Sequence, residues 1–196
     1  MTLSLIRLGV PEETYDAYAL LGVCITSIAR LEHTIDKVVI CIDRAASKLV
    51  ARLHEEATKS KKPPRDIDQK TTLICNYLIA TSQSGRPALR SDFQNSVRDI
   101  YDQRIRLLHS ELSQWRLDTS DLSTSFSFSK YDVEKLPSGK SRIVLQAFEL
   151  TDATLEALVK ISEEIIEDLR CCFPEMSLID TEVDAMIKES YSKRGA

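Results

Sequence analysis

Glycine is scarce in this sequence, where only five of the 196 residues are glycine. There is no glycine-rich phosphate-binding loop, no Gly-x-Ser-x-Gly motif and no His-Glu-x-x-His motif. These motifs respectively build a phosphate cradle, a nucleophilic serine and a catalytic zinc site. Their absence argues against the P-loop nucleotide hydrolases, the α/β-hydrolases and the zinc proteases.

Recognisable metal-binding patterns are missing as well. The five cysteines form no Cys-x-x-Cys pair and no cysteine–histidine cluster of zinc spacing, so we expect reduced thiols that fill the core. The stretch "LEHTID" holds Glu32, His33 and Asp36, but a di-iron bundle site needs Glu-x-x-His on two helices and further glutamates. That pattern is absent, and we expect neither a metal nor another cofactor.

Long apolar runs are also lacking, and no segment approaches the roughly 18 uninterrupted apolar residues that suggest a membrane-spanning helix. The beginning of the chain, "MTLSLIRLGVPEETYD", has neither the basic start nor the apolar run of a signal peptide. We therefore expect a cytoplasmic protein with no membrane partner.

The charge balance is mildly acidic, with a net charge of −4 and a pI near 5.5. This gives no global attraction to nucleic acid, and no DNA specificity is evident. Contact with RNA would depend on a local basic patch, such as "KSKKPPR" or the cluster of Arg98, Arg104 and Arg106. A charge run of this kind is equally typical of a solvated loop.

Helical periodicity dominates what is present. Apolar residues recur at steps of three and four over about 11–57, which predicts one very long helix or two nearly collinear helices. Such a stripe is typical of packing in a bundle or across a dimer. The prolines of "KSKKPPR" should end this helix in an exposed loop. Two further helices are predicted over about 67–82 and 88–114.

The periodicity then changes from helical to alternating. "STSFSFSKYDV" alternates phenylalanine with serine, and "SRIVLQAFEL" is rich in β-branched and aromatic residues. Pro137 and Gly139 lie between these two stretches. Together they predict a β-hairpin over about 122–149.

After the hairpin, Thr151 or Asp152 should cap a helix that runs to about Cys172. A short amphipathic helix is expected over about 178–191. With 43% hydrophobic residues, the chain suits one compact domain over 1–196. The expected fold is mostly α, an up-down helical bundle with one very long N-terminal helix and an inserted β-hairpin.

The stretch "YDQRIRLLHSELSQW" carries an arginine where a core residue is expected. Arg104 falls close to the centre of an apolar stripe formed by Phe93, Val97, Ile100, Leu108 and Trp115. A buried guanidinium cannot lose its proton, so it requires a carboxylate, a phosphate or water. Glu32 flanks the stripe of the first helix, and Glu111 lies on the same stripe as the arginine. We predict that Arg104 is partly buried and pairs with Glu32, Glu111 or both.

His109 follows Arg104 by five positions, which puts the two side chains roughly 140° apart around a helix. The histidine should lie at the edge of the stripe, near a groove or a subunit seam. Arg106 is closer to His109 on the helix and is a rival member of any site. In the structural alternative, Arg104 and Glu32 form an ion pair and His109 has no catalytic part.

This arrangement resembles the HEPN superfamily (higher eukaryotes and prokaryotes nucleotide-binding domains). The resemblance consists of an arginine, four residues and a histidine late in a helix, followed by Ser110, Trp115, a hairpin and "FELTDATLEALVKISEEI". The stretch "ITSIARLEHTIDKV" is similar to the first long helix of bacterial members, where an acidic residue at the place of Glu32 faces the arginine–histidine helix. The likeness spans roughly residues 20–169.

The resemblance implies a dimeric helical bundle whose two motif helices meet near the twofold axis. Many members are metal-independent endoribonucleases, often toxins of defence or toxin–antitoxin systems that are paired with a cognate antitoxin. Carried onto this chain, Arg104 would stabilise charge on the scissile phosphate of an RNA. His109 would act as general acid or base, leaving a cyclic phosphate.

One position departs from the family pattern. Members usually carry a polar residue, often asparagine, directly after the arginine, whereas this chain has Ile105. The alternative reading is therefore a noncatalytic module that binds a partner or a nucleotide, in which Arg104 and His109 are structural.

Overall fold

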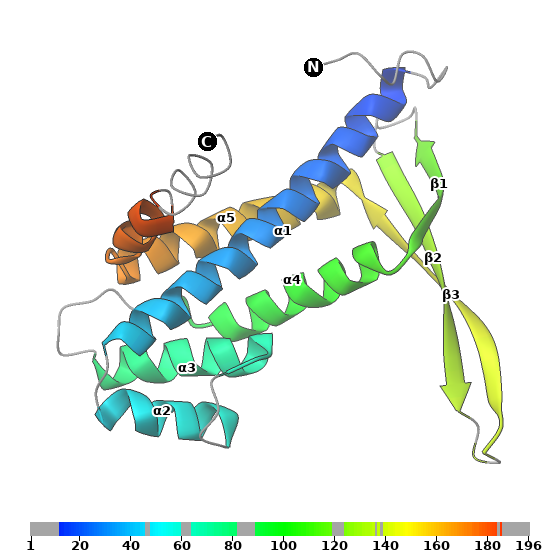
Figure 1. The fold of residues 1–196 in the computed structure, drawn as a ribbon. Helices are drawn as coiled ribbons and strands as arrows, with labels where there is room; N and C mark the ends of the chain where they lie inside the picture. The colour runs from blue at the N-terminus through cyan, green and yellow to red at the C-terminus, as the bar shows by residue number, and fades with distance from the viewer. Residues whose placement is uncertain are drawn as a thin grey trace, which may run out of the picture. The chain divides into compact units, whose positions relative to one another are not determined.

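The computed structural model describes residues 12–45, 48–59, 64–81, 89–118, 124–135, 137, 139–183 and 185. The described chain is mostly helical and carries one small antiparallel sheet (Figure 1). Its elements are α1 (Glu12–Arg44), α2 (Lys48–Thr58), α3 (Ile67–Ala80), α4 (Phe93–Leu108), β1 (Glu111–Leu117), β2 (Thr124–Lys135), β3 (Ser141–Thr151) and α5 (Asp152–Cys172). Within these ranges, no helix combines the length and apolar character that crossing a bilayer requires.

The chain divides into two compact units, and the division falls inside α1, α4 and α5. The described residues of Met1–Ile28 and Asp99–Ile161 form the first unit, and those of Ala29–Arg98 and Ser162–Ala196 form the second. The single domain expected over 1–196 stays a prediction.

The first unit is built around the three-stranded sheet, whose strands lie in the order β1-β2-β3. β2 pairs with β3 along its whole length, from Ser125 opposite Thr151 to Lys135 opposite Ser141, so the predicted hairpin is confirmed. Gly139 adopts a φ of 78° in the connecting turn, a conformation that favours glycine. Among the side chains of the sheet that the structure describes, Phe126, Phe128 and Leu150 are buried.

The second unit has an apolar helical core. Tyr77 of α3 stacks on Phe173 with ring centroids 6.0 Å apart. The predicted helix over about 67–82 is confirmed as α3, which begins where the Asp66 carboxylate accepts a hydrogen bond from the Gln69 backbone N–H at 2.8 Å. The largest fully buried side chains of this unit are Leu31, Ile35, Ile42, Leu73, Ile74, Phe93, Ile165, Ile166 and Phe173.

The first helical stretch is two helices that are not collinear. In a straight helix, two residues eleven positions apart are separated by about 16 Å along the axis. Yet His54 Nε2 of α2 lies 2.6 Å from Asp43 Oδ1 of α1. The chain therefore turns back after Arg44. The expected very long N-terminal helix is present as α1, but its continuation to about residue 57, or collinearly into α2, is wrong.

The loop "KSKKPPR" ends α2 as predicted, at Thr58. Lys59 adopts a positive φ of 53°, which interrupts the helix. Pro64 is buried, so full exposure of this loop is wrong at that position. Its residues 60–63 lie outside the described part.

The C-terminal half matches the sequence closely at α5, which starts at Asp152 and ends at Cys172 as predicted. The final helix begins earlier than expected and covers residues 176–183. The expected continuation towards residue 191 falls largely outside the described residues. Two ion pairs attach this last helix to α1, one between Lys37 and Asp180 and one between Arg44 and Glu182.

Candidate functional site

The buried stripe of α4 runs directly through Arg104. Phe93, Val97, Ile100 and Leu107 are each at most 7% exposed. Their spacing of four and three residues makes position 104 the missing member of the series. Leu108, which was expected on the stripe, is 47% exposed instead. The stripe therefore passes through Leu107, and Arg104 occupies a core-facing position.

The Arg104 side chain is half-buried. Its guanidinium carbon lies 5.8 Å from the centroid of the Tyr101 ring, near the outer limit for a cation–π contact. Glu32 is also half-buried and belongs to the second unit, whereas Arg104 belongs to the first. The pairing of Arg104 with Glu32 stays a prediction.

The predicted position of Glu111 is wrong. α4 was expected to run from about 88 to 114, but it begins at Phe93 and ends at Leu108. Glu111 is instead the first residue of β1, is exposed, and lies opposite Ser129 of β2. The helical argument for a pair between Glu111 and Arg104 therefore fails. Trp115 likewise belongs to β1, opposite Phe126, and not to the helical stripe.

His109 is the first residue after α4 and is exposed. Its backbone N–H still donates a hydrogen bond to the Ile105 carbonyl at 3.1 Å, so the backbone continues the helical pattern for one more residue. The ring is therefore presented at the end of a helix and not within its packed face. This position leaves the imidazole accessible to a substrate.

Two polar side-chain atoms near this helix end are buried without a hydrogen-bond partner in the described structure. They are Ser110 Oγ and Gln103 Oε1, and they come from opposite sides of the motif in sequence. An unsatisfied buried polar group costs about 1–3 kcal/mol. An ordered water or a ligand group can supply the missing hydrogen bonds at such atoms. Sequence reasoning included Ser110 but gave no signal for Gln103.

A groove lies beside the end of α4 and has a volume of about 510 Å³. It is lined by Arg106 of α4, Lys130 of β2, and Leu145, Gln146, Ala147 and Phe148 of β3. Two cationic side chains and one amide face this groove, which suits an anionic group such as a phosphate. Arg106, and not Arg104, is the arginine that the structure brings to this groove.

The aromatic wall of the groove is supported from within the sheet. The rings of Phe128 and Phe148 stack with centroids 5.1 Å apart and planes inclined by 12°. Lys130 Nζ lies 3.9 Å from Asp132 Oδ2, and the Gln146 side-chain amide donates to the same oxygen at 3.3 Å. The cation is thus only loosely engaged and can reach a ligand.

Sequence reasoning missed Lys130 and Gln146 as site residues, although a signal was present. On the inward-facing side of β2, Lys130 follows Phe126 and Phe128. On the same side of β3, Gln146 precedes Phe148 and Leu150, so each polar residue takes the next place in an apolar series. They lie opposite each other across the hairpin. A paired switch from apolar to polar residues at one register position is therefore the pattern that identifies them.

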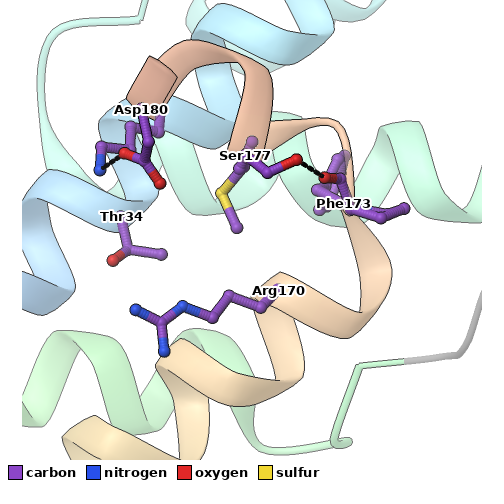
Figure 2. A pocket seen from close by; sticks show the side chains of 8 residues that line it. Thr34, Arg170, Phe173, Ser177 and Asp180 are labelled. Atoms are coloured by element: carbon purple, nitrogen blue, oxygen red, sulfur yellow. Dashed lines mark hydrogen bonds and ion pairs between the residues drawn. The ribbon is translucent and has the colours of Figure 1, made fainter. Parts of the chain in front are cut away.

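A second, smaller cavity of about 230 Å³ lies in the second unit, between α1, the end of α5 and the last helix (Figure 2). Figure 2 shows Arg170 reaching towards the side of the cavity occupied by Thr34. Lys37 forms an ion pair with Asp180, and Arg170 Nη1 lies 3.6 Å from Glu167 Oε2. Both cations of this cavity have an acidic neighbour, as Lys130 has in the groove, so charge alone does not separate the two sites. The groove is preferred because it is larger and lies at the end of α4.

Thiol and metal chemistry find little support in the described ranges. All five cysteines are free, and Cys24, Cys41 and Cys172 are buried. Cys171 is exposed, so the expectation that every cysteine fills the core is wrong there. Burial raises the pKa of Cys24 to about 11, which keeps it protonated and unreactive. No group of three or more metal-ligating side chains occurs among the described residues.

Comparisons with known proteins add no neighbour. No family model matches the chain, and no curated protein or solved structure shows significant similarity to it.

Proposed function

We propose that this chain is a HEPN-like up-down helical bundle that acts in the cytoplasm and cleaves RNA without a metal, using Arg104 and His109. The observation that carries the proposal is the end of α4. There, Arg104 and Arg106 precede an exposed His109, and Arg106 faces a groove that also contains Lys130. Cationic side chains beside an accessible imidazole are the groups that metal-independent RNA cleavage requires.

The residues divide the work by their chemistry. Arg106 and Lys130 hold the phosphate backbone in the groove, since their charges lie on its lining. Arg104 does not line the groove, and its role comes from the family resemblance: it supplies a permanent positive charge for the phosphoryl oxygens in the transition state. His109 takes the proton of a ribose 2′-hydroxyl, whose oxygen then attacks phosphorus. The bond from phosphorus to the 5′-oxygen breaks, the leaving oxygen takes a proton from water, and the products are a 2′,3′-cyclic phosphate and a 5′-hydroxyl.

A noncatalytic module is the second candidate, and one observation favours it. Arg104 is half-buried against Tyr101, and the residue beside it is Ile105, which is 36% exposed. An arginine in such a position can serve to anchor the helix end, while the groove binds a nucleotide or an RNA without cleaving it. In either case a homodimer and a cognate antitoxin are the partners that the family resemblance suggests.

Incubation with RNA separates the two candidates. Purified protein is mixed with an RNA pool in EDTA, beside His109→Ala, Arg104→Ala and the double variant Arg106→Ala/Lys130→Ala. Arg170→Ala is the matched control, because it removes an exposed arginine from the other cavity. The chemical ends of the RNA fragments and the binding of RNA are measured on the same samples.

The enzyme proposal predicts cyclic phosphate ends with the wild type and with Arg170→Ala, and none with His109→Ala or Arg104→Ala. The Arg106→Ala/Lys130→Ala variant should bind RNA more weakly. Intact RNA in every lane, with binding lost only in the groove variant, would favour the noncatalytic module. Cleavage by His109→Ala at the wild-type rate would overturn the catalytic assignment.

A further inference from the structure

The apolar face of the hairpin changes sides halfway along its length. Near the helices, Phe126, Phe128, Phe148 and Leu150 occupy one face of the sheet. Further along, the apolar side chains are Tyr131, Val133, Ile143 and Leu145, which occupy the opposite face because side chains alternate along a strand. Both strands switch at matching register positions. A half-buried sheet normally keeps one apolar face, so the switch indicates that a different surface covers the far half.

The far half forms an arm of two strands only. β1 pairs with Thr124–Ser129 and not beyond, whereas β2 and β3 continue to Lys135 and Ser141 (Figure 1). On this arm, Tyr131 lies opposite Leu145 and Val133 lies opposite Ile143. An isolated two-stranded hairpin is marginally stable in water. The arm therefore lacks the support that a third strand or a helix usually gives.

The four side chains form a contiguous exposed surface, which we call the arm patch. Tyr131 is 78% exposed, Val133 62%, Ile143 74% and Leu145 57%. Their exposed area amounts to roughly 500 Å², near the upper limit of about 600 Å² for the largest apolar patch on a typical monomer. Pairing two copies of the patch would bury roughly 1,000 Å², the lower limit for a specific protein–protein interface.

Charged residues flank the arm patch in a self-complementary order. On the same face, Lys135 lies on one side of the patch, towards the hairpin turn. Glu111, in the row of Ser129, and Glu149, in the row of Ser127, lie on the other side. All three charged residues are exposed. Along the strands this face therefore carries a basic residue, the apolar patch and two acidic residues, and Arg116 follows in the row of Ser125.

We propose that the arm patch is an interface with a second copy of this chain. A twofold axis between the Tyr131 and Val133 rows places each patch on its partner in reversed direction. The same operation sets Lys135 of each copy opposite the row that contains Glu111 of the other. One twofold rotation thus buries both apolar patches and forms two pairs of opposite charge. Flanking residues of a single charge sign would instead repel each other. The proposal does not depend on RNA cleavage.

Charge reversal tests this geometry directly. In Lys135→Glu the acidic side chain would face Glu111 across the twofold axis, and in Glu111→Lys the basic side chain would face Lys135. Each variant alone should self-associate about tenfold or more weakly than the wild type, because like charges then oppose each other. A mixture of the two variants restores opposite charges at both contacts and should form a heterodimer. Light scattering and analytical sedimentation measure the mass of the species in solution, which is 22.1 kDa for a single chain.

Arg142→Glu is the matched control, since it reverses a charge on the same arm but on the face opposite the patch. It disrupts only the exposed ion pair with Glu134, at 2.6 Å, and should leave the dimer intact. Val133→Lys should abolish self-association, with circular dichroism confirming that the helices remain folded. Supporting results are a wild-type mass near twice that of one chain and rescue by the mixed variants.

The proposal is overturned if the wild type remains monomeric at high micromolar concentration. It is also overturned if both charge variants dimerise as well as the wild type, which would assign the dimer to another surface such as the motif helices. Loss of association in each variant without rescue in the mixture would reject the twofold geometry. If RNA cleavage fails in the earlier experiment while the mixture rescues the dimer, only the proposed function is lost.

Discussion

Truncating two aromatic residues on one strand should have very different effects. Phe126 is 0% exposed and faces the core of the first unit, whereas Tyr131 is 78% exposed on the arm patch. Replacing a buried phenylalanine by alanine costs about 3–5 kcal/mol, from lost transfer free energy and the cavity left behind. An exposed cross-strand pair contributes about 0.2–1 kcal/mol, which bounds the cost of Tyr131→Ala.

Thermal unfolding measures both changes. One kcal/mol shifts Tm by about 2–4 °C in a chain of this size, so Phe126→Ala should lower it by about 6–20 °C. Tyr131→Ala should lower it by at most about 4 °C. The protein must be dilute enough to be monomeric, because association would otherwise stabilise the arm. Calorimetry is preferable, since two compact units can unfold in separate transitions and Phe126→Ala should then shift only one.

The reasoning is refuted if the two variants lose similar stability in the monomer. Equal losses would show that Tyr131 is covered by the chain itself, and the arm patch would not be a free surface. A loss below about 1 kcal/mol for Phe126→Ala would show that the sheet does not pack as described.

Three further predictions follow from the second unit and the thiols. His54→Ala should lower the free energy of unfolding by about 1 kcal/mol, because it removes the hydrogen bond that holds α2 to Asp43; urea unfolding with an unchanged slope checks this. The hydrogen bond from Arg90 lowers the pKa of Asp92 below its ordinary 3.8. The stability that this pair gives is present above that value and lost as pH falls through the folded-state pKa, and Asp92→Asn should flatten this acid dependence. A thiol reagent at neutral pH should label exposed Cys171 first and leave Cys24, with its pKa of about 11, unlabelled until unfolding.

The sequence predicted the elements whose signals are local. α3, α5 and the hairpin have clear periodicity, and their capping or turn residues occur where the structure needs them. The break between α1 and α2 was missed because the apolar stripe continues across it, through Ile42, Val50 and Leu53. Periodicity records which side chains are buried, and a helix that folds back can bury the same positions as one that continues.

The end of α4 was missed for a similar reason. Leu108 and Trp115 extend the helical spacing, and no proline or glycine interrupts "LLHSELSQW". The structure instead starts β1 at Glu111, where pairing with β2 satisfies the backbone groups. The pairing partners lie in the next strand of the chain, outside the stretch that carries the helical spacing, so inter-strand hydrogen bonds overrode the local pattern. Consequently the half-buried position of Arg104 agrees with the prediction, whereas His109 lies just after the helix and Glu111 lies in a strand.

The early end of α4 also changes how its cations should be interpreted. The last turn of a helix presents unpaired carbonyl groups and a partial negative charge, which Arg106 and a nearby histidine can offset. The same residues can therefore stabilise the helix end without any substrate. The two roles differ in what they require, because a helix end needs only positive charge, whereas proton transfer needs a group that titrates. His109→Lys keeps the positive charge but supplies no neutral base near pH 7, so it should preserve the stability of the helix end and abolish cleavage.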